Sequence, residues 1–204
     1  MLSADSVAWN PHKLLAAPQQ CSVLLTRHPG LLEACHERRA PYLFQRDKFY
    51  TPELDPGDKY LQCGRRVDVF KFWLMWKAKG TVGLQQHVDW LMSLSRELLV
   101  ELRRRNNRFR LVLENPAFIN VGFWYIPPRL RTRNDESSED YKTQLNAVAP
   151  RIKEGMVRGG TMMLGYQPLR QWPNFFRFVV QNSGVTRQDL IFMLDEIERL
   201  GVDL

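Results

Sequence analysis

The chain has 204 residues, of which 44% are hydrophobic and 25% are charged, and its formal net charge is +7. These fractions are typical of globular proteins and exclude a disordered chain, and the length allows one ordinary domain or two small ones. No apolar run approaches the ~20 residues of a membrane span, and the first residues lack a signal-peptide pattern, so we expect no membrane partner. Three cysteines without a C-x-x-C pair argue against a disulfide framework and favour a cytoplasmic location.

The positive net charge raises the possibility of a nucleic-acid partner. The densest basic run, Arg103 to Arg105 with Arg108 and Arg110, lies where an amphipathic helix should end. Cations at that end complement the helix dipole, so the run has a structural explanation, although excess arginine also attracts acidic small molecules. No zinc-finger spacing or aromatic RNA-binding motif is present, and we therefore expect no nucleic-acid partner and no metal site.

The first 66 residues contain two predicted strands and a long irregular stretch. Residues 3–9 are rich in apolar side chains and predict a buried strand, and residues 21–26 predict a second one. Two strands need further partners for a stable sheet, and the next 50 or so residues do not obviously supply them. Residues 40–66 contain several prolines and glycines and predict an irregular segment. We therefore expect the chain to be the later part of a longer protein.

The remainder predicts alternating helices and strands. Residues 69–79 indicate a short apolar helix that ends at Gly80, and a long helix follows from Gly83 with an apolar stripe. Strands are expected at 109–113 and 119–126, a charged loop at 131–140, and then a helix that Pro150 begins or interrupts. Two more strands are expected at 161–166 and 174–181, before a last helix capped by Thr186 and Asp189. Residues 84–204 therefore predict an α/β layer with its own core, distinct from residues 1–83.

The segment Asn10-Pro11-His12-Lys13 is the sharpest local signal for chemistry. A lysine on a proline-fixed turn after a buried strand is held on rigid backbone, where partial desolvation favours the neutral amine that Schiff-base chemistry needs. Asn10 and His12 beside it can donate hydrogen bonds to an anion such as a phosphate. On these four residues alone, an exposed turn lysine is the simpler interpretation.

Longer strings decide between these interpretations. Almost the whole chain, from residue 3 onward, resembles the C-terminal portion of the pyridoxal-phosphate-dependent acidic amino-acid decarboxylases, which act on glutamate, cysteine sulfinate or aspartate. The matching strings are ADSVAWNPHKLLAA (4–17), YLFQRDKFY (42–50), GDKYLQCGRRVDVFKFWLMWKAKGT (57–81), FWYIPP (123–128), GYQPLRQWPNFFR (165–177) and LDEIERLGVDL (194–204). Residues 16–22 and 166–183 most resemble the arthropod aspartate decarboxylase branch.

The resemblance implies roles for five residues. Lys13 matches the lysine that binds pyridoxal phosphate covalently, and Asn10 and His12 match residues near the cofactor phosphate. Tyr42 matches a tyrosine of a mobile catalytic loop, which protonates the substrate after carbon dioxide leaves. Arg177 matches the arginine that binds the substrate α-carboxylate. For Cys63, in CGRR, a small buried apolar role is the preferred interpretation.

For the whole molecule, the resemblance implies an α/β fold. The chain would be the C-terminal part of a fold type I enzyme that depends on pyridoxal 5'-phosphate, with the end of the large cofactor domain in residues 1–83 and the small C-terminal domain in residues 84–204. It would decarboxylate an acidic amino acid, aspartate first, as a cytoplasmic homodimer when full length. We expect the chain by itself to be inactive, because the upstream residues that contact the cofactor ring have no match in it. The alternative is a catalytically silent isoform that acts by dimerising with a full-length partner.

Overall fold

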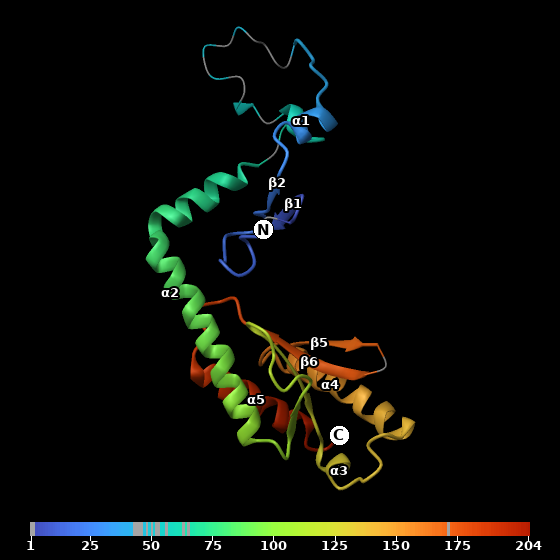
Figure 1. The fold of residues 1–204 in the computed structure, drawn as a ribbon. Coiled ribbons are helices and arrows are strands. Elements are labelled where there is room, and N and C mark those ends of the chain that lie inside the picture. Colours follow the sequence, from blue (N-terminus) through green and yellow to red (C-terminus); the bar gives the residue numbers. More distant parts are fainter. Residues whose placement is uncertain are drawn as a thin grey trace. The chain divides into compact units, whose positions relative to one another are not determined.

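The structure of the protein is a computed structural model that describes residues 3–42, 47, 49, 51, 54, 55, 57–62, 64, 66–170 and 172–204. The chain divides into two compact units, Met1–Thr81 and Val82–Leu204. The helices and strands of both units are drawn in Figure 1. Among the described residues, no helix is both long enough and apolar enough to traverse a lipid bilayer.

The first unit contains a two-stranded antiparallel sheet. Strand β1 (Ser6–Trp9) pairs with β2 (Val23–Thr26), and Trp9 lies opposite Val23. A short helix, α1 (Leu31–His36), and a 3-10 turn, η2 (Gly57–Lys59), follow. The predicted strand positions are confirmed, but the predicted burial is wrong, because Trp9 is 40% exposed and Leu24 is 51% exposed. The reason is that no third strand joins this sheet within the described part of the chain, as the missing sheet partners in the sequence predicted.

Helix α2 (Asp68–Arg104) joins the two units and is broken at Gly80. This glycine has φ 66° and ψ 177°, a backbone conformation that side chains with a Cβ rarely adopt. The predicted break between a helix that ends at Gly80 and one that begins at Gly83 is therefore confirmed, and it takes the form of a kink within one helix. After the kink, Leu84, Leu91, Leu98 and Leu102 of the predicted apolar stripe are buried, and Val88 is half-buried.

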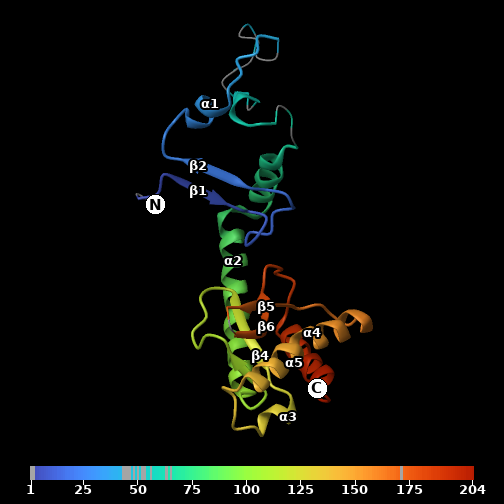
Figure 2. The ribbon, with the colours of Figure 1, turned by 90° about the vertical axis from the view of Figure 1, so that its right-hand side faces the viewer.

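The second unit is a four-stranded antiparallel sheet covered by helices. Its strand order is β3 (Phe109–Leu111), β4 (Asn120–Tyr125), β6 (Trp172–Val179) and β5 (Gly165–Leu169). Helices α4 (Glu139–Gly159) and α5 (Arg187–Gly201) pack on one face of this sheet, as Figure 2 shows. Residues alternate between the two faces of a strand, so Val121, Phe123 and Tyr125 of β4 point into the core and are buried. Asn120, Gly122 and Trp124 are thereby placed on the opposite face.

Pro150 neither begins nor interrupts a helix, contrary to the expectation. It lies inside α4, which starts at Glu139 after the N-cap Ser138. Proline lacks the N–H that would bond the carbonyl four residues earlier, and that carbonyl belongs to Asn146. Asn174 Nδ2 donates to the backbone carbonyl oxygen of Asn146 at 3.0 Å, and the Asn174 backbone N–H donates to Asn146 Oδ1 at 2.9 Å. Strand β6 therefore satisfies the group that the proline leaves open, and the helix continues.

Strand β5 begins later than predicted. The expected start of this strand at residue 161 is wrong, because Gly160 (φ 64°) ends α4 and the Thr161 N–H donates back to Met156 O at 3.2 Å. These bonds hold residue 161 in the helix C-terminal turn, and the strand starts only at Gly165. A four-residue helix, α3 (Pro128–Arg131), also follows β4 where no helix was expected. The predicted capping of α5 is confirmed, with Thr186 and Asp189 each accepting the other's backbone N–H.

Candidate functional site

A series of turns fixes the backbone on both sides of Lys13. The Lys13 N–H donates to Asn10 O at 3.0 Å, and the Ala16 N–H donates to Lys13 O at 3.1 Å. The Ala17 N–H closes the segment by donating to Pro11 O at 3.1 Å. The expected partial desolvation of Lys13 is wrong for this chain, because its side chain is exposed; its ammonium makes no hydrogen bond or ion pair to any residue the structure describes. The turn therefore presents an unpaired primary amine on a constrained backbone.

His12 and Asn10 are anchored to the start of β2. His12 Nδ1 lies 2.5 Å from Cys21 O and 3.3 Å from the Cys21 nitrogen. Both backbone groups of Cys21 thus face Nδ1, and the tautomer of the ring decides whether Nδ1 accepts from the Cys21 N–H or donates to the Cys21 carbonyl. Nε2 is then the ring nitrogen that remains for a ligand. Ser22 Oγ donates to Asn10 Oδ1 at 2.8 Å, which leaves the amide N–H groups of Asn10 as donors.

The other candidate residues lie elsewhere in the chain. Tyr42 is 79% exposed and is followed directly by residues 43–46, which are outside the described part. Cys63 also lies outside the described residues, so its expected buried role stays a prediction. Arg177 belongs to the second unit, on β6, and is not part of the turn that carries Lys13.

Arg177 lies on the face of the sheet opposite α4 and α5. Its Nε–H donates to Asn120 Oδ1 at 3.1 Å across the β4–β6 pair. Both residues line a cavity of about 190 Å³, to which Gln167, Trp172 and Phe175 also contribute. The arrangement therefore provides a cation beside a partly apolar cavity, which suits a small anionic group.

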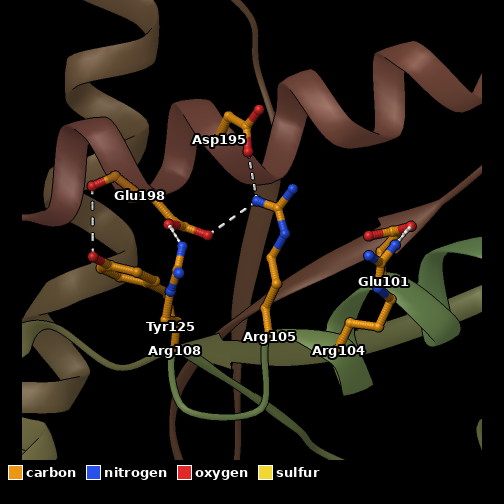
Figure 3. A network of polar contacts seen from close by, with 7 residues as sticks. All are labelled: Glu101, Arg104, Arg105, Arg108, Tyr125, Asp195 and Glu198. Carbon is orange, nitrogen blue, oxygen red and sulfur yellow. Dashed lines mark hydrogen bonds and ion pairs between the residues drawn. The ribbon is translucent and has the colours of Figure 1, made fainter.

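The basic run at the end of α2 forms ion pairs with α5, as Figure 3 shows. Arg105 Nη1 lies 2.5 Å from Asp195 Oδ1 and 3.0 Å from Glu198 Oε1, and Arg108 Nη1 lies 2.5 Å from Glu198 Oε2. Partial burial opposes the charge of Arg105, but the hydrogen bonds to Asp195 and Glu198 outweigh it and raise the pKa of Arg105. These ion pairs give the basic run a structural role within the second unit, which agrees with the explanation that does not involve nucleic acid.

The sequence did not indicate three residues that support these sites: Ser22, Lys71 and Asn120. Lys71 Nζ donates to Pro18 O at 3.1 Å and to Gln20 O at 2.5 Å, and so holds the segment after Lys13. More than fifty positions in the sequence separate Lys71 from Pro18 and Gln20, and no local sequence pattern predicts a contact between residues so far apart. For Asn120 a signal existed, because strand alternation places it on the same face as Gly122.

Comparison with known proteins assigns the chain to a family. The family described as the pyridoxal-dependent decarboxylase conserved domain matches residues 1–126. Cysteine sulfinic acid decarboxylase of Homo sapiens is 55% identical over 202 residues, which cover 98% of this chain and 40% of that protein. Acidic amino acid decarboxylase GADL1 of Xenopus tropicalis is 52% identical, with 98% and 39% covered. The chain thus spans about two fifths of the length of these curated relatives.

Solved structures agree in fold. The crystal structure of mouse CSAD matches with a TM-score of 0.89 and 52% identity over 98% of this chain and 40% of that chain. Tryptophan decarboxylase of Catharanthus roseus, in complex with L-tryptophan, matches with a TM-score of 0.75 at 21% identity, over 98% of this chain and 37% of that chain. The predicted α/β fold is confirmed as that of pyridoxal-phosphate-dependent, fold type I decarboxylases.

Proposed function

Because the chain belongs to the pyridoxal-dependent decarboxylase family, we propose that it forms the C-terminal part of an enzyme that decarboxylates an acidic amino acid. In this proposal residues 1–83 end the large cofactor domain and residues 84–204 form the small domain of a homodimer. The similarity to a cysteine sulfinic acid decarboxylase and to an acidic amino acid decarboxylase supports the acidic substrate class. Aspartate as the preferred substrate rests on the sequence strings at 16–22 and 166–183.

One observation carries the proposal: the unpaired amine of Lys13 on its constrained turn. The residues around it fit pyridoxal phosphate, since Lys13 can bind an aldehyde covalently and the Asn10 amide can donate to a phosphate. His12 would contact the phosphate through Nε2, the nitrogen not engaged by Cys21. When bound, pyridoxal phosphate supplies the electron sink for the pair left behind by carbon dioxide.

Two further residues would act on the substrate. Arg177 would bind the α-carboxylate, because a guanidinium holds a carboxylate through two parallel charge-assisted hydrogen bonds. Tyr42 would deliver a proton to the α-carbon from its hydroxyl, and its 79% exposure leaves that group accessible. Lys13 would accept or return a proton at Nζ when the product amine leaves.

The test is a chimera in which this chain replaces the matching C-terminal part of human cysteine sulfinic acid decarboxylase. We expect carbon dioxide release from aspartate, cysteine sulfinate or glutamate, and a pyridoxyl adduct on Lys13 after borohydride reduction. Lys13→Ala should remove both the adduct and essentially all turnover, whereas Lys77→Ala, on α2, should retain both. A folded Lys13→Ala chimera with parental turnover would refute the proposal.

A silent, partner-binding isoform is the second candidate. It is favoured by the apolar side chains that the first unit exposes, including Leu24 (51%), Leu25 (52%) and Phe70 (53%). Exposed apolar surface of this kind marks an interface. Co-expression of this chain with a full-length decarboxylase, followed by size-exclusion chromatography, distinguishes the two. A stable heterodimer together with an inactive chimera would favour the silent isoform.

A further inference from the structure

Arg177 is held at one of its three guanidinium nitrogens. Its Nε–H donates to Asn120 Oδ1 at 3.1 Å. No other hydrogen bond or ion pair of this side chain occurs with the residues that the structure describes, so both terminal NH₂ groups remain without a protein acceptor there. A guanidinium can receive a carboxylate side-on, through Nε and one NH₂ group, or end-on, through both NH₂ groups. Asn120 occupies the nitrogen that the side-on arrangement needs.

The register of the sheet makes this bond possible and leaves the β5 side of Arg177 open. Gly122 of β4 and Gly165 of β5 lie directly opposite Arg177 on the two flanking strands. Asn120 lies two residues from Gly122 on the same face, a diagonal position that a long side chain such as arginine reaches. A Cβ at Gly165 would meet no atom within 4 Å, so the β5 side of Arg177 is open, whereas a Cβ at Gly122 would lie 3.1 Å from Phe175 Cε2 and 3.3 Å from Val112 Cβ, so these side chains flank Arg177 on the β4 side.

The cavity beside this pair suits a small carboxylate. It measures about 190 Å³ and is lined by Arg177 and Asn120 together with apolar side chains such as Trp172 and Phe175. Apolar walls lower the local dielectric and strengthen the attraction between a guanidinium and an anion. Among the described residues that line the cavity, none is acidic, so none competes for Arg177.

We propose that Asn120 is a positioning residue that fixes Arg177 so that its two terminal NH₂ groups receive the substrate carboxylate end-on. The inference rests on the proposed function, in which Arg177 binds that carboxylate. An amide suits this task because it accepts the Nε–H without neutralising the guanidinium. Aspartate at the same position would accept the bond but cancel the charge, and leucine would leave Nε open to side-on binding.

The experiment uses the 204-residue chain, labelled with [¹⁵N]arginine, and sodium acetate as the probe. The Arg177 Nε–Hε resonance is assigned with Arg177→Lys, and its exchange with water is measured. Loss of one hydrogen bond to a charged group should make exchange at least about tenfold faster in Asn120→Leu. Gln167→Leu, which removes another amide from the same cavity, is the matched control and should leave exchange unchanged. Asn120→Asp should keep slow exchange but lose the acetate-induced shift of the terminal NH₂ groups.

Two outcomes would overturn the inference. One is an Asn120→Leu variant with a native spectrum whose Hε exchange and acetate response match those of the parent chain. The other is a parent chain in which the NH₂ resonances of Arg177 do not respond to acetate. This result would show that these groups do not bind a carboxylate. Neither outcome concerns the Lys13 adduct, so failure of this inference is distinguishable from failure of the proposed decarboxylation.

Discussion

Lys71 shows how a single side chain can hold a turn that begins far away in the sequence. Its ammonium donates to two carbonyls, Pro18 O and Gln20 O, and lies 3.3 Å from Asp68 Oδ1. Cys21 Sγ adds a contact of 3.7 Å to Asp68 O. The segment that follows Lys13 is therefore attached to the first turn of α2 by polar contacts.

Removing this ammonium should loosen the segment that carries Lys13. In Lys71→Ala, the carbonyls of Pro18 and Gln20 lose a charged donor, and each such bond contributes on the order of 1.5–3 kcal/mol. We expect amide hydrogens of residues 12–21 to exchange at least about tenfold faster by mass spectrometry. Lys77→Ala on the same helix is the control, since the interaction found for Lys77 is with the Trp73 ring. Equal exchange in both variants would show that Lys71 does not hold the segment.

Glu196 links stability to pH. Arg199 donates two hydrogen bonds of 2.7 Å to its carboxylate, and with a third from Thr161 they lower the pKa of Glu196 from 4.5 to about 2, against the effect of burial. A lowered folded-state pKa contributes stability above pH 4.5 that is lost as the pH falls toward 2. Glu196→Gln should therefore make the melting temperature fall less steeply across this interval, as circular dichroism can measure. A slope equal to that of the parent would exclude Glu196 as a source of acid sensitivity.

At the scale of elements, α5 is fitted closely against β4 and α4. A Cβ at Gly201 would overlap Tyr125 Cε1 and lie 2.9 Å from Ile152 Cδ1, and both neighbours are buried. Glycine is thus required here by space and not by backbone conformation. The ion pairs of Arg105 and Arg108 hold the same helix to the end of α2 (Figure 3).

Gly201→Ala should destabilise the second unit. Overpacking of a filled core costs about 1–3 kcal/mol, because the aromatic ring of Tyr125 has no room to move. Gly159→Ala provides a control of the opposite sign: its Cβ would meet only Thr161 Cγ2, at 3.6 Å, and alanine favours a helix by about 0.5–1 kcal/mol. Urea unfolding followed by tryptophan fluorescence measures both. Equal stability of the two variants would contradict the close approach of Gly201 to Tyr125.

At the scale of the whole molecule, the two units differ in how much core they have. Nearly all buried apolar residues belong to Val82–Leu204, and among the described residues of the first unit only Ala17 and Cys21 are buried hydrophobic side chains. Burial of apolar surface is the main favourable term in folding. The second unit therefore holds most of the stabilising free energy.

Limited proteolysis should reveal this difference. We expect rapid cleavage within residues 3–81 and a resistant fragment that begins near Val82, because cleavage follows the population of locally unfolded states. Mass spectrometry of the fragments identifies the cleavage sites. Equal resistance of the two units would show that the first unit is stabilised by something other than its buried apolar residues.

Local sequence patterns were sufficient to predict many features of this protein. The kink at Gly80, the capping of α5 by Thr186 and the order of the strands and longer helices after residue 84 follow from glycine conformation, capping chemistry and hydrophobic periodicity. The family could be identified because long strings carry more information than four residues, and those strings include the Lys13 turn. These features depend on residues that are close together in the chain.

Only the tertiary structure decided the features that depend on distant residues. Pro150 lies inside a helix because Asn174 bonds the carbonyl it leaves open, and this requires β6 to lie beside α4. Asn120 meets Arg177 because of the β4–β6 register, and a shift of one residue would place them on opposite faces. Sequence periodicity determines which face of an element is apolar. It does not determine which partner that element meets or in which register, because those depend on packing of the whole unit.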